Sequence, residues 1–253
     1  YLQEPCSPED LESSIMKVLE KKEREAARRR GELADPVAQG TIITVFGAKG
    51  GIGKTTIASN LAVALASQGY SVGIVDADIY GYSVPRMLGT DRDPVVIDDM
   101  LIPPENHGVR CISIGYFVPE GQAIIWRGPM LHKALEQFLA DVFWDDPDFL
   151  LIDMPPGTGD IALSLSQYLP RAEVYVVTTP QPAAQKVAAL SAAMAAKVNL
   201  PVKGIIENMS WLTGDDGTQY EIFGSGGGQA LADVDHVADG AHHRLVDVGV
   251  DQL

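Results

Sequence analysis

The chain has 253 residues, of which 46% are hydrophobic and 21% are charged, as in an ordinary folded domain with a substantial core. Its 34 acidic residues outnumber the 19 Lys and Arg residues, and the formal net charge of −15 argues against nucleic-acid binding, because such a surface repels phosphate backbones. No apolar stretch approaches the ~18 residues that a membrane-spanning helix needs, so no integral membrane segment is predicted.

Two cysteines, Cys6 and Cys111, lie far apart in the sequence. Their spacing predicts neither a disulfide framework nor a metal-binding cysteine pair, and it fits a reducing compartment best. We therefore expect a cytoplasmic protein.

Residues 1–38 are expected to form a helical appendage and a linker. Ser7 can cap a helix that begins at Pro8 and continues to about residue 30. The basic and acidic side chains of residues 17–30 favour a solvated helix face. An apolar stripe with helical spacing occupies the first half of this helix: Leu11, Ile15, Val18 and Leu19.

Residues 39–232 are expected to form the main domain, because short apolar runs alternate with amphipathic segments. The runs are rich in β-branched residues and predict strands at 42–46, 72–75, 109–114, 149–152, 174–177 and 204–206. Helices are predicted at about 54–68, 128–142, 160–168 and 183–198. This order indicates an α/β fold with a doubly wound, mostly parallel sheet, in which ligands bind at the carboxyl ends of the strands.

Residues 233–253 contain five Asp and three His residues and little apolar periodicity. We expect a poorly ordered, acidic polar tail. A metal site built from these His and Asp side chains is the alternative.

The segment 47–56 predicts a phosphate-binding loop. It follows the first predicted strand, precedes a predicted helix, and reads Gly47-Ala48-Lys49-Gly50-Gly51-Ile52-Gly53-Lys54-Thr55-Thr56. Glycines let the backbone N–H groups approach phosphate oxygens, and the helix N-terminus adds a positive dipole end. We therefore expect this loop to bind Mg-ATP.

Each polar group of the loop has an expected role. Lys54 reaches the β- and γ-phosphates, and the Thr55 hydroxyl ligates Mg²⁺. Lys49 is a second lysine in the loop. It cannot easily bind a phosphate that Lys54 of the same subunit already holds. The residues expected to contact the nucleotide through the loop itself are Ala48, Gly50, Gly51, Ile52, Gly53, Thr55 and Thr56.

Acidic residues follow two other predicted strands. Asp153 is the candidate for holding Mg²⁺ directly or through water, with Asp76 in support. Asp78 is a candidate for orienting or deprotonating the attacking water, and the backbone N–H of Gly157 for sensing the γ-phosphate. An N-cap or turn role is the alternative for any single Asp, but three acids at strand ends beside a phosphate loop favour the site.

These motifs resemble the deviant Walker A ATPases, which include MinD, ParA, the nitrogenase iron protein and the Mrp/ApbC proteins. The Lys49–Thr55 stretch and Asp76-Ala77-Asp78 are common to that group. The Mrp/ApbC proteins are favoured by four further stretches: Trp126-Arg127-Gly128-Pro129-Met130, Asp153-Met154-Pro155-Pro156-Gly157-Thr158-Gly159-Asp160, Thr179-Pro180-Gln181 and Glu207-Asn208-Met209-Ser210.

The resemblance implies an ATP-hydrolysing homodimer that handles iron–sulfur clusters and delivers them to apoprotein clients. ATP is then expected at the dimer interface, with Lys49 reaching the partner's phosphates and Asn208 at the adenine. Mrp-type carriers have a Cys-x-x-Cys pair shortly after the Asn-Met-Ser stretch, but residues 211–220 contain no cysteine. We therefore expect ATP binding without a stable four-cysteine cluster on this chain unaided.

Two other interpretations stay open at this point. One is a MinD-like positioning, scaffold or pilus-assembly ATPase, since residues 41–56 resemble the pilus-assembly relatives of MinD and residues 1–30 resemble the end of a receiver domain. The other is a nucleotide-binding module that hydrolyses little.

Overall fold

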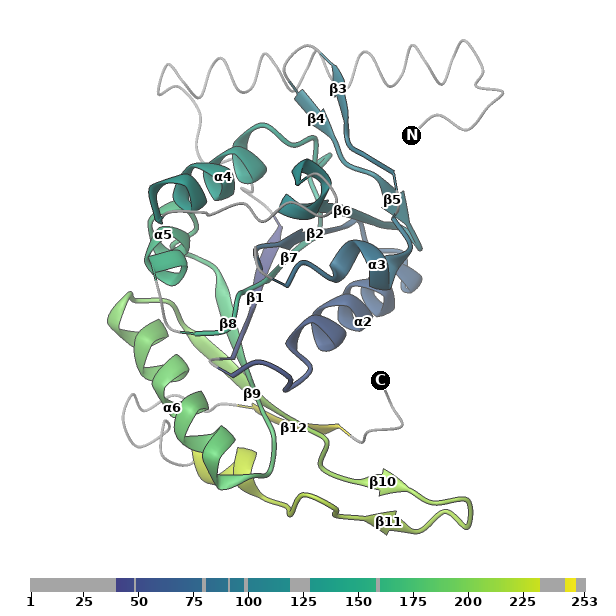
Figure 1. The fold of residues 1–253 in the computed structure, drawn as a ribbon, viewed down its shortest axis with the longest axis vertical. Helices are drawn as coiled ribbons and strands as arrows, with labels where there is room; N and C mark the ends of the chain where they lie inside the picture. Colours follow the sequence, from purple (N-terminus) through teal and green to yellow (C-terminus); the bar gives the residue numbers. More distant parts are fainter. Residues whose placement is uncertain are drawn as a thin grey trace.

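The computed structural model describes residues 40–47, 49–78, 81–90, 92–97, 100–118, 128–157, 160–232 and 244–248. Its central feature is an eight-stranded sheet with the order β12-β9-β8-β1-β7-β2-β6-β5 (Figure 1). All its strand pairs are parallel except β5–β6. The sheet strands are β1 (Thr41–Phe46), β2 (Val72–Asp76), β5 (Glu105–Asn106), β6 (Val109–Ser113), β7 (Phe149–Asp153), β8 (Glu173–Thr178), β9 (Val202–Asn208) and β12 (Arg244–Val248).

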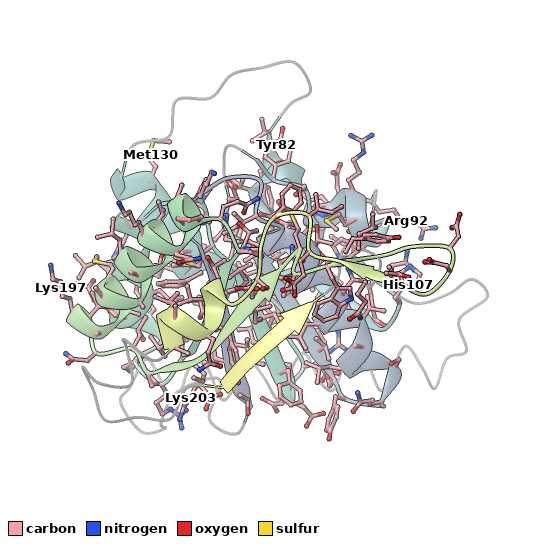
Figure 2. The ribbon with its side chains drawn as sticks, turned by 90° about the horizontal axis from the view of Figure 1, so that it is seen from below. Tyr82, Arg92, His107, Met130, Lys197 and Lys203 are labelled. Atoms are coloured by element: carbon pink, nitrogen blue, oxygen red, sulfur yellow. The ribbon has the colours of Figure 1, made fainter. Side chains whose placement is uncertain are left out.

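Helices cover both faces of this sheet, as Figure 1 shows, with α2 and α3 on one side and α4, α5 and α6 on the other. Figure 2 shows the same two layers from another side, with Met130 of α4 and Lys197 of α6 on one side of the molecule and Arg92 and His107 on the other. The helices are α2 (Lys54–Ser67), α3 (Val84–Leu88), α4 (Gly128–Ala140), α5 (Asp160–Tyr168) and α6 (Pro182–Lys197), with a 3₁₀ turn η1 (Ile114–Phe117).

Each helical layer has its own apolar core against the sheet. One core packs side chains of α2 and α3, such as Ile57 and Leu88, onto the strands. The other packs α4, α5 and α6 onto the opposite face through residues such as Phe138, Leu165 and Ala192. Strands buried on both faces carry nearly continuous apolar sequence, which is why they could be predicted from the sequence.

The predicted α/β fold with a doubly wound, mostly parallel sheet is confirmed. All six predicted strands form, and the four predicted helices lie within two residues of their expected bounds. Several small elements were not predicted: α3, η1, the hairpin β3 (Val95–Ile97) with β4 (Met100–Ile102), β5, and the hairpin β10 (Leu212–Thr213) with β11 (Gln219–Tyr220).

The expectation of a poorly ordered polar tail is wrong for residues 244–248. They form β12, which pairs in parallel with β9 along the register Arg244↔Gly204 to Val248↔Asn208. Leu245, Val246 and Val248 give this strand its apolar residues, but Asp247 interrupts them and hides the pattern in a single sequence. The predicted helix at 7–30, the linker and the His and Asp residues of 233–243 lie outside the described residues.

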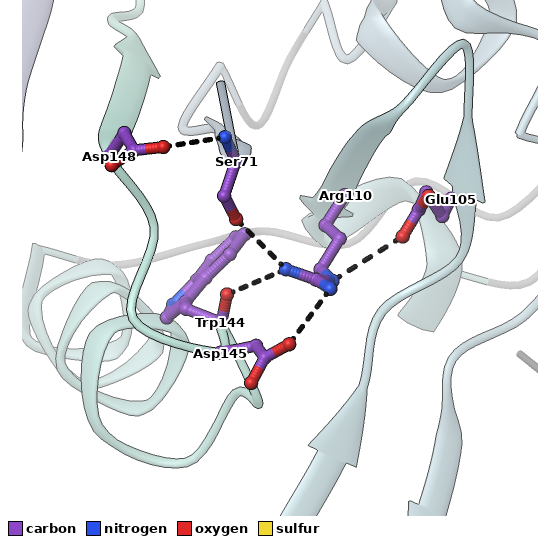
Figure 3. Close-up of polar contacts among 6 residues, drawn as sticks. All are labelled: Ser71, Glu105, Arg110, Trp144, Asp145 and Asp148. Carbon is purple, nitrogen blue, oxygen red and sulfur yellow. Dashed lines mark hydrogen bonds and ion pairs between the residues drawn. The ribbon is translucent and has the colours of Figure 1, made fainter. Parts of the chain in front are cut away.

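Arg110 fastens the edge of the sheet where β6 and β7 begin (Figure 3). Its guanidinium donates to the carbonyl of Trp144 at 2.9 Å and to Asp145 Oδ2 at 3.2 Å, and it pairs with Glu105 at 3.4 Å. Nearby, Asp148 Oδ2 accepts the backbone N–H of Ser71 at 2.9 Å. These bonds lie at the strand starts, opposite the edge that carries the phosphate loop. Within the described ranges, no helix is long and apolar enough to cross a membrane.

Candidate nucleotide-binding site

The predicted phosphate loop connects β1 to α2 at the carboxyl edge of the sheet (Figure 1). Gly51 and Gly53 have φ values of +79° and +85°, a left-handed conformation that glycine adopts without the cost of a Cβ. Helix α2 begins at Lys54, and among the described residues no side chain caps its N-terminus. Its first N–H groups are therefore left to meet an anion. Ala48 lies outside the described residues.

Lys54 is 6% exposed and lies beneath the loop, where its Nζ donates to the carbonyl oxygen of Lys49 at 3.3 Å. Burial lowers the pKa of Lys54, and the charges of Asp153 and Asp78 oppose that change. A buried ammonium group at the uncapped N-terminus of a helix is a group that a phosphate can pair with. The side chain of Lys49 is exposed, as a group that reaches a second molecule must be.

Sheet register brings Asp76 and Asp153 together, since they are direct partners in the β2–β7 pair. Both are fully buried. Among the described residues, neither carboxylate oxygen of Asp153 has a hydrogen-bond partner of good geometry, although the Thr55 hydroxyl lies close enough to lower its pKa. Burial is the larger effect and raises the pKa of Asp153 to about 6.

An orphaned, fully buried carboxylate is costly unless something else satisfies it. A Mg²⁺ ion in a nucleotide site is bound by one or two protein oxygens together with phosphate oxygens and waters. Asp153 and the neighbouring Thr55 hydroxyl are oxygen donors of that kind. The residues present therefore fit a nucleotide-bound Mg²⁺.

Asp76 is satisfied by other groups. Its Oδ1 accepts the N–H of Asp78 at 3.1 Å, and its Oδ2 accepts the N–H of Val84 and the hydroxyl of Ser113, each at 3.2 Å. Burial and the nearby charge of Asp153 raise the pKa of Asp76 to about 8 despite these bonds. A direct contact between Asp76 and Mg²⁺ stays a prediction.

Asp78 and Gly157 are the other residues predicted to act on the γ-phosphate. Asp78 is half-buried, close enough to Lys54 and Asp153 to affect both pKa values, and its Oδ1 accepts the N–H of Gly81 at 3.1 Å. Gly157 is exposed after β7 with φ +115°. Their roles toward water and phosphate stay predictions.

Asn208 ends β9 and reaches across to the phosphate loop. It is fully buried, its Nδ2 donates to the carbonyl of Ile52 at 2.9 Å, and its Oδ1 accepts the N–H of Met209 at 2.9 Å. A Cβ added at Gly53 would collide with the Asn208 amide. Asn208 therefore braces the loop, which the sequence did not predict, and its contact with adenine stays a prediction.

Two further buried polar residues near the site, Ser113 and Glu207, were not predicted from the sequence. Ser113, at the end of β6, belongs to no motif, and only its hydrogen bond to Asp76 reveals it. Glu207, next to Asn208, binds the Ser210 hydroxyl at 3.1 Å and the backbone N–H of Gly228, and so ties the glycine-rich segment to β9. Glu207 does lie in the Glu-Asn-Met-Ser stretch, which was the only available signal.

Cys111 lies in β6 and is fully buried. Burial raises the pKa of its thiol to about 12, so the thiolate that metals require is strongly disfavoured there. Among the described residues, no group of three or more His, Cys, Asp or Glu side chains could hold a metal ion.

Comparison with known proteins identifies relatives for most of the chain. The iron–sulfur cluster carrier protein of Mycobacterium leprae is 49% identical over 200 residues, which are 79% of this chain and 52% of that protein. The carrier protein of Escherichia coli is 44% identical over 241 residues, which are 93% of this chain and 65% of that protein. The chain thus spans about half to two thirds of the length of these curated relatives.

Solved structures show the same fold. A nucleotide-binding protein from Archaeoglobus fulgidus, in complex with ADP, is 32% identical with a TM-score of 0.71 over 84% of this chain and 82% of that one. MinD from Pyrococcus horikoshii, complexed with Mg-ADP, is 25% identical with a TM-score of 0.50 over 67% of this chain and 70% of that one. A family model, described as ParA: NUBPL iron-transfer P-loop NTPase, matches residues 39–242. The predicted resemblance to the Mrp/ApbC carriers is confirmed, and the chain belongs to the NUBPL iron-transfer P-loop NTPase family.

Proposed function

We propose that this chain binds Mg-ATP at the loop of residues 47–56. The observation that carries the proposal is a buried lysine, Lys54, close to a buried carboxylate, Asp153, that has no hydrogen-bond partner among the described residues, both beside an uncapped helix N-terminus. ADP and Mg-ADP in the related structures are consistent with it. The loop N–H groups and Lys54 bind the phosphates, while Thr55 and Asp153 hold Mg²⁺, which supplies charge neutralisation when bound.

Asp153→Asn tests the metal part of this proposal, with Asp148→Asn as the matched control at the opposite edge of the sheet. Removing the charge of Asp153 should weaken ATP binding in the presence of Mg²⁺ by roughly 10-fold or more, with a much smaller effect in EDTA. The control should bind as the unaltered protein does. Equal Mg²⁺ dependence in the two variants would remove Asp153 from the metal site.

We further propose slow ATP hydrolysis by a homodimer. Lys49 is exposed, and in the dimer it would reach the partner's phosphates and stabilise transition-state charge there, as an arginine finger does. Asp78 would orient or deprotonate the attacking water, and its nearness to Lys54 supports this. Asp78→Ala should lower kcat by 10-fold or more and spare ATP affinity. Unchanged steady-state hydrolysis would eliminate Asp78 from the mechanism.

The biological context proposed is iron–sulfur cluster assembly in the cytoplasm, with apoproteins as clients. The names of the Mycobacterium leprae and Escherichia coli relatives, iron–sulfur cluster carrier proteins, support it. The TM-score is also higher with the Archaeoglobus fulgidus nucleotide-binding protein, 0.71, than with Pyrococcus horikoshii MinD, 0.50. The cluster would be cargo. Cys111 is a poor ligand because it is buried and its pKa is raised, so we propose that no stable four-cysteine cluster forms on this chain alone.

Anaerobic reconstitution with iron and sulfide tests this directly. We expect little bound iron after desalting and no change on Cys111→Ser. Close to one four-iron cluster per dimer, lost in Cys111→Ser, would contradict the proposal and assign the thiol as a ligand.

A further inference from the structure

Ser113 occupies a position that nothing about the phosphate loop explains. It is the last residue of β6, fully buried, and the direct register partner of Asp76 on β2. Its hydroxyl accepts the N–H of Gly115 at 3.1 Å and donates to Asp76 Oδ2 at 3.2 Å. One side chain therefore connects the turn after β6 to a carboxylate at the nucleotide edge.

Asp76 also accepts hydrogen bonds from two backbone N–H groups. Its Oδ1 accepts the N–H of Asp78, and its Oδ2 accepts the N–H of Val84, which begins α3. A carboxylate offers about four lone-pair sites, and these bonds together with Ser113 use three of them. Asp76 thus fixes the backbone N–H groups of Asp78 and Val84, at the two ends of the segment that carries Asp78.

We propose that Ser113 is a positioning residue for ATP hydrolysis, acting through Asp76 on the placement of Asp78. The Ser113 bond holds the Asp76 carboxylate in the orientation in which both of its oxygens meet the backbone of residues 78–84. Without it, Asp76 loses one of its two neighbours on Oδ2, and its carboxylate is freer to rotate. Asp78 then occupies its working position for a smaller fraction of the time, while the phosphate loop is untouched.

This inference rests on the proposed hydrolysis, and it separates two kinds of contribution. Lys54 and the loop determine affinity for the nucleotide, whereas the path from Ser113 through Asp76 to Asp78 determines the rate of turnover. A residue that served only the stability of the sheet would change neither quantity selectively.

The test compares Ser113→Ala with Ser113→Thr, which keeps the hydroxyl, and with Ser67→Ala, an exposed serine at the end of α2 whose hydroxyl bonds only to the carbonyl of Ala64 in the described structure. Three quantities are measured: Mg-ATP affinity by calorimetry, steady-state kcat, and amide hydrogen exchange in the nucleotide-free protein. For Ser113→Ala we expect kcat to fall roughly 5- to 10-fold, as for one lost buried hydrogen bond, with affinity within about 2-fold.

Hydrogen exchange of the N–H groups of Asp78 and Val84 should rise in Ser113→Ala and stay normal in Ser67→Ala. Ser113→Thr should restore kcat and exchange. This exchange readout needs no nucleotide, so it decides the Ser113–Asp76 connection even if the protein hydrolyses no ATP. Unchanged exchange at both amides, or a fall in affinity equal to the fall in kcat, would overturn the positioning role.

Discussion

Replacing Gly53 with alanine tests the geometry of the phosphate loop. Gly53 has φ +85° and ψ 22°, a left-handed conformation that costs an L-residue roughly 1–2 kcal/mol. Its new Cβ would also collide with the Asn208 amide, so that the Asn208–Ile52 bond must break. Leaving those buried polar groups unsatisfied costs about 1–3 kcal/mol more. We therefore expect Gly53→Ala to lower the free energy of unfolding by about 2–5 kcal/mol.

Gly69→Ala is the matched control, because Gly69 has φ +91° and a Cβ there would meet nothing within 4 Å. It should cost only the backbone strain of roughly 1–2 kcal/mol and leave Mg-ATP affinity unchanged. Gly53→Ala should also weaken Mg-ATP binding by about 10-fold or more, since the loop carbonyls and N–H groups are displaced.

Urea unfolding and calorimetry measure both effects. Asn208→Ala makes room for the new Cβ, so the double variant Gly53→Ala/Asn208→Ala should lose less stability than the sum of the single variants. Equal stability loss in Gly53→Ala and Gly69→Ala, or strict additivity in the double variant, would refute the contact between the loop and β9.

Three other perturbations give separate tests. Arg110→Ala should lower the free energy of unfolding by roughly 1–3 kcal/mol without affecting Mg-ATP affinity. Lys203→Ala, which removes an exposed ion pair with Glu173 at 3.9 Å, should lower it by under about 0.5 kcal/mol. Equal losses in the two variants would contradict the arrangement in Figure 3. The pKa of Asp76 is about 8 in the folded protein against an ordinary 3.8, so between pH 6 and 8 the folded state keeps a proton that the unfolded state has lost. The free energy of unfolding should therefore fall as pH rises, by up to about 1.4 kcal/mol per pH unit. Asp76→Asn should flatten this slope, and an unchanged slope would assign it to another group. Lys49→Ala should keep ATP affinity and lose both hydrolysis and ATP-driven dimer formation in sedimentation, and a normal ATP-dependent dimer would exclude its role in the partner's site.

The sheet and the phosphate loop could be predicted because their signals are local. The apolar runs that end in Asp76 and Asp153 are buried on both faces. The loop glycines Gly51 and Gly53 lie in the left-handed conformation, which glycine adopts readily. The sequence also predicted that carboxylates gather at one edge. It did not predict that Asp76 and Asp153 are register partners, because that follows from the order β1-β7-β2, which no local pattern encodes.

The rest of the site depends on contacts between distant segments. Asn208 braces Ile52 across 156 residues, and Ser113 acquires its partner only when β6 pairs with β2. Strand β12 could be identified only from its pairing with β9, because Asp247 interrupts its short apolar run. The β10–β11 hairpin was missed although Gly214-Asp215-Asp216-Gly217 is a turn sequence, in which the N–H of Gly217 donates to the carbonyl of Gly214 at 2.9 Å.

Calorimetric titration of Mg-ATP into the unaltered protein, Lys54→Ala and Lys197→Ala tests the central claim most directly. Lys54 is buried beneath the loop, whereas Lys197 ends α6 at the periphery (Figure 2), so the same substitution removes a phosphate-binding cation in one variant and a surface cation in the other. We expect saturable binding by the unaltered protein and by Lys197→Ala, and affinity lower by roughly 30-fold or more in Lys54→Ala. Equal affinity in all three proteins would contradict ATP binding at this loop.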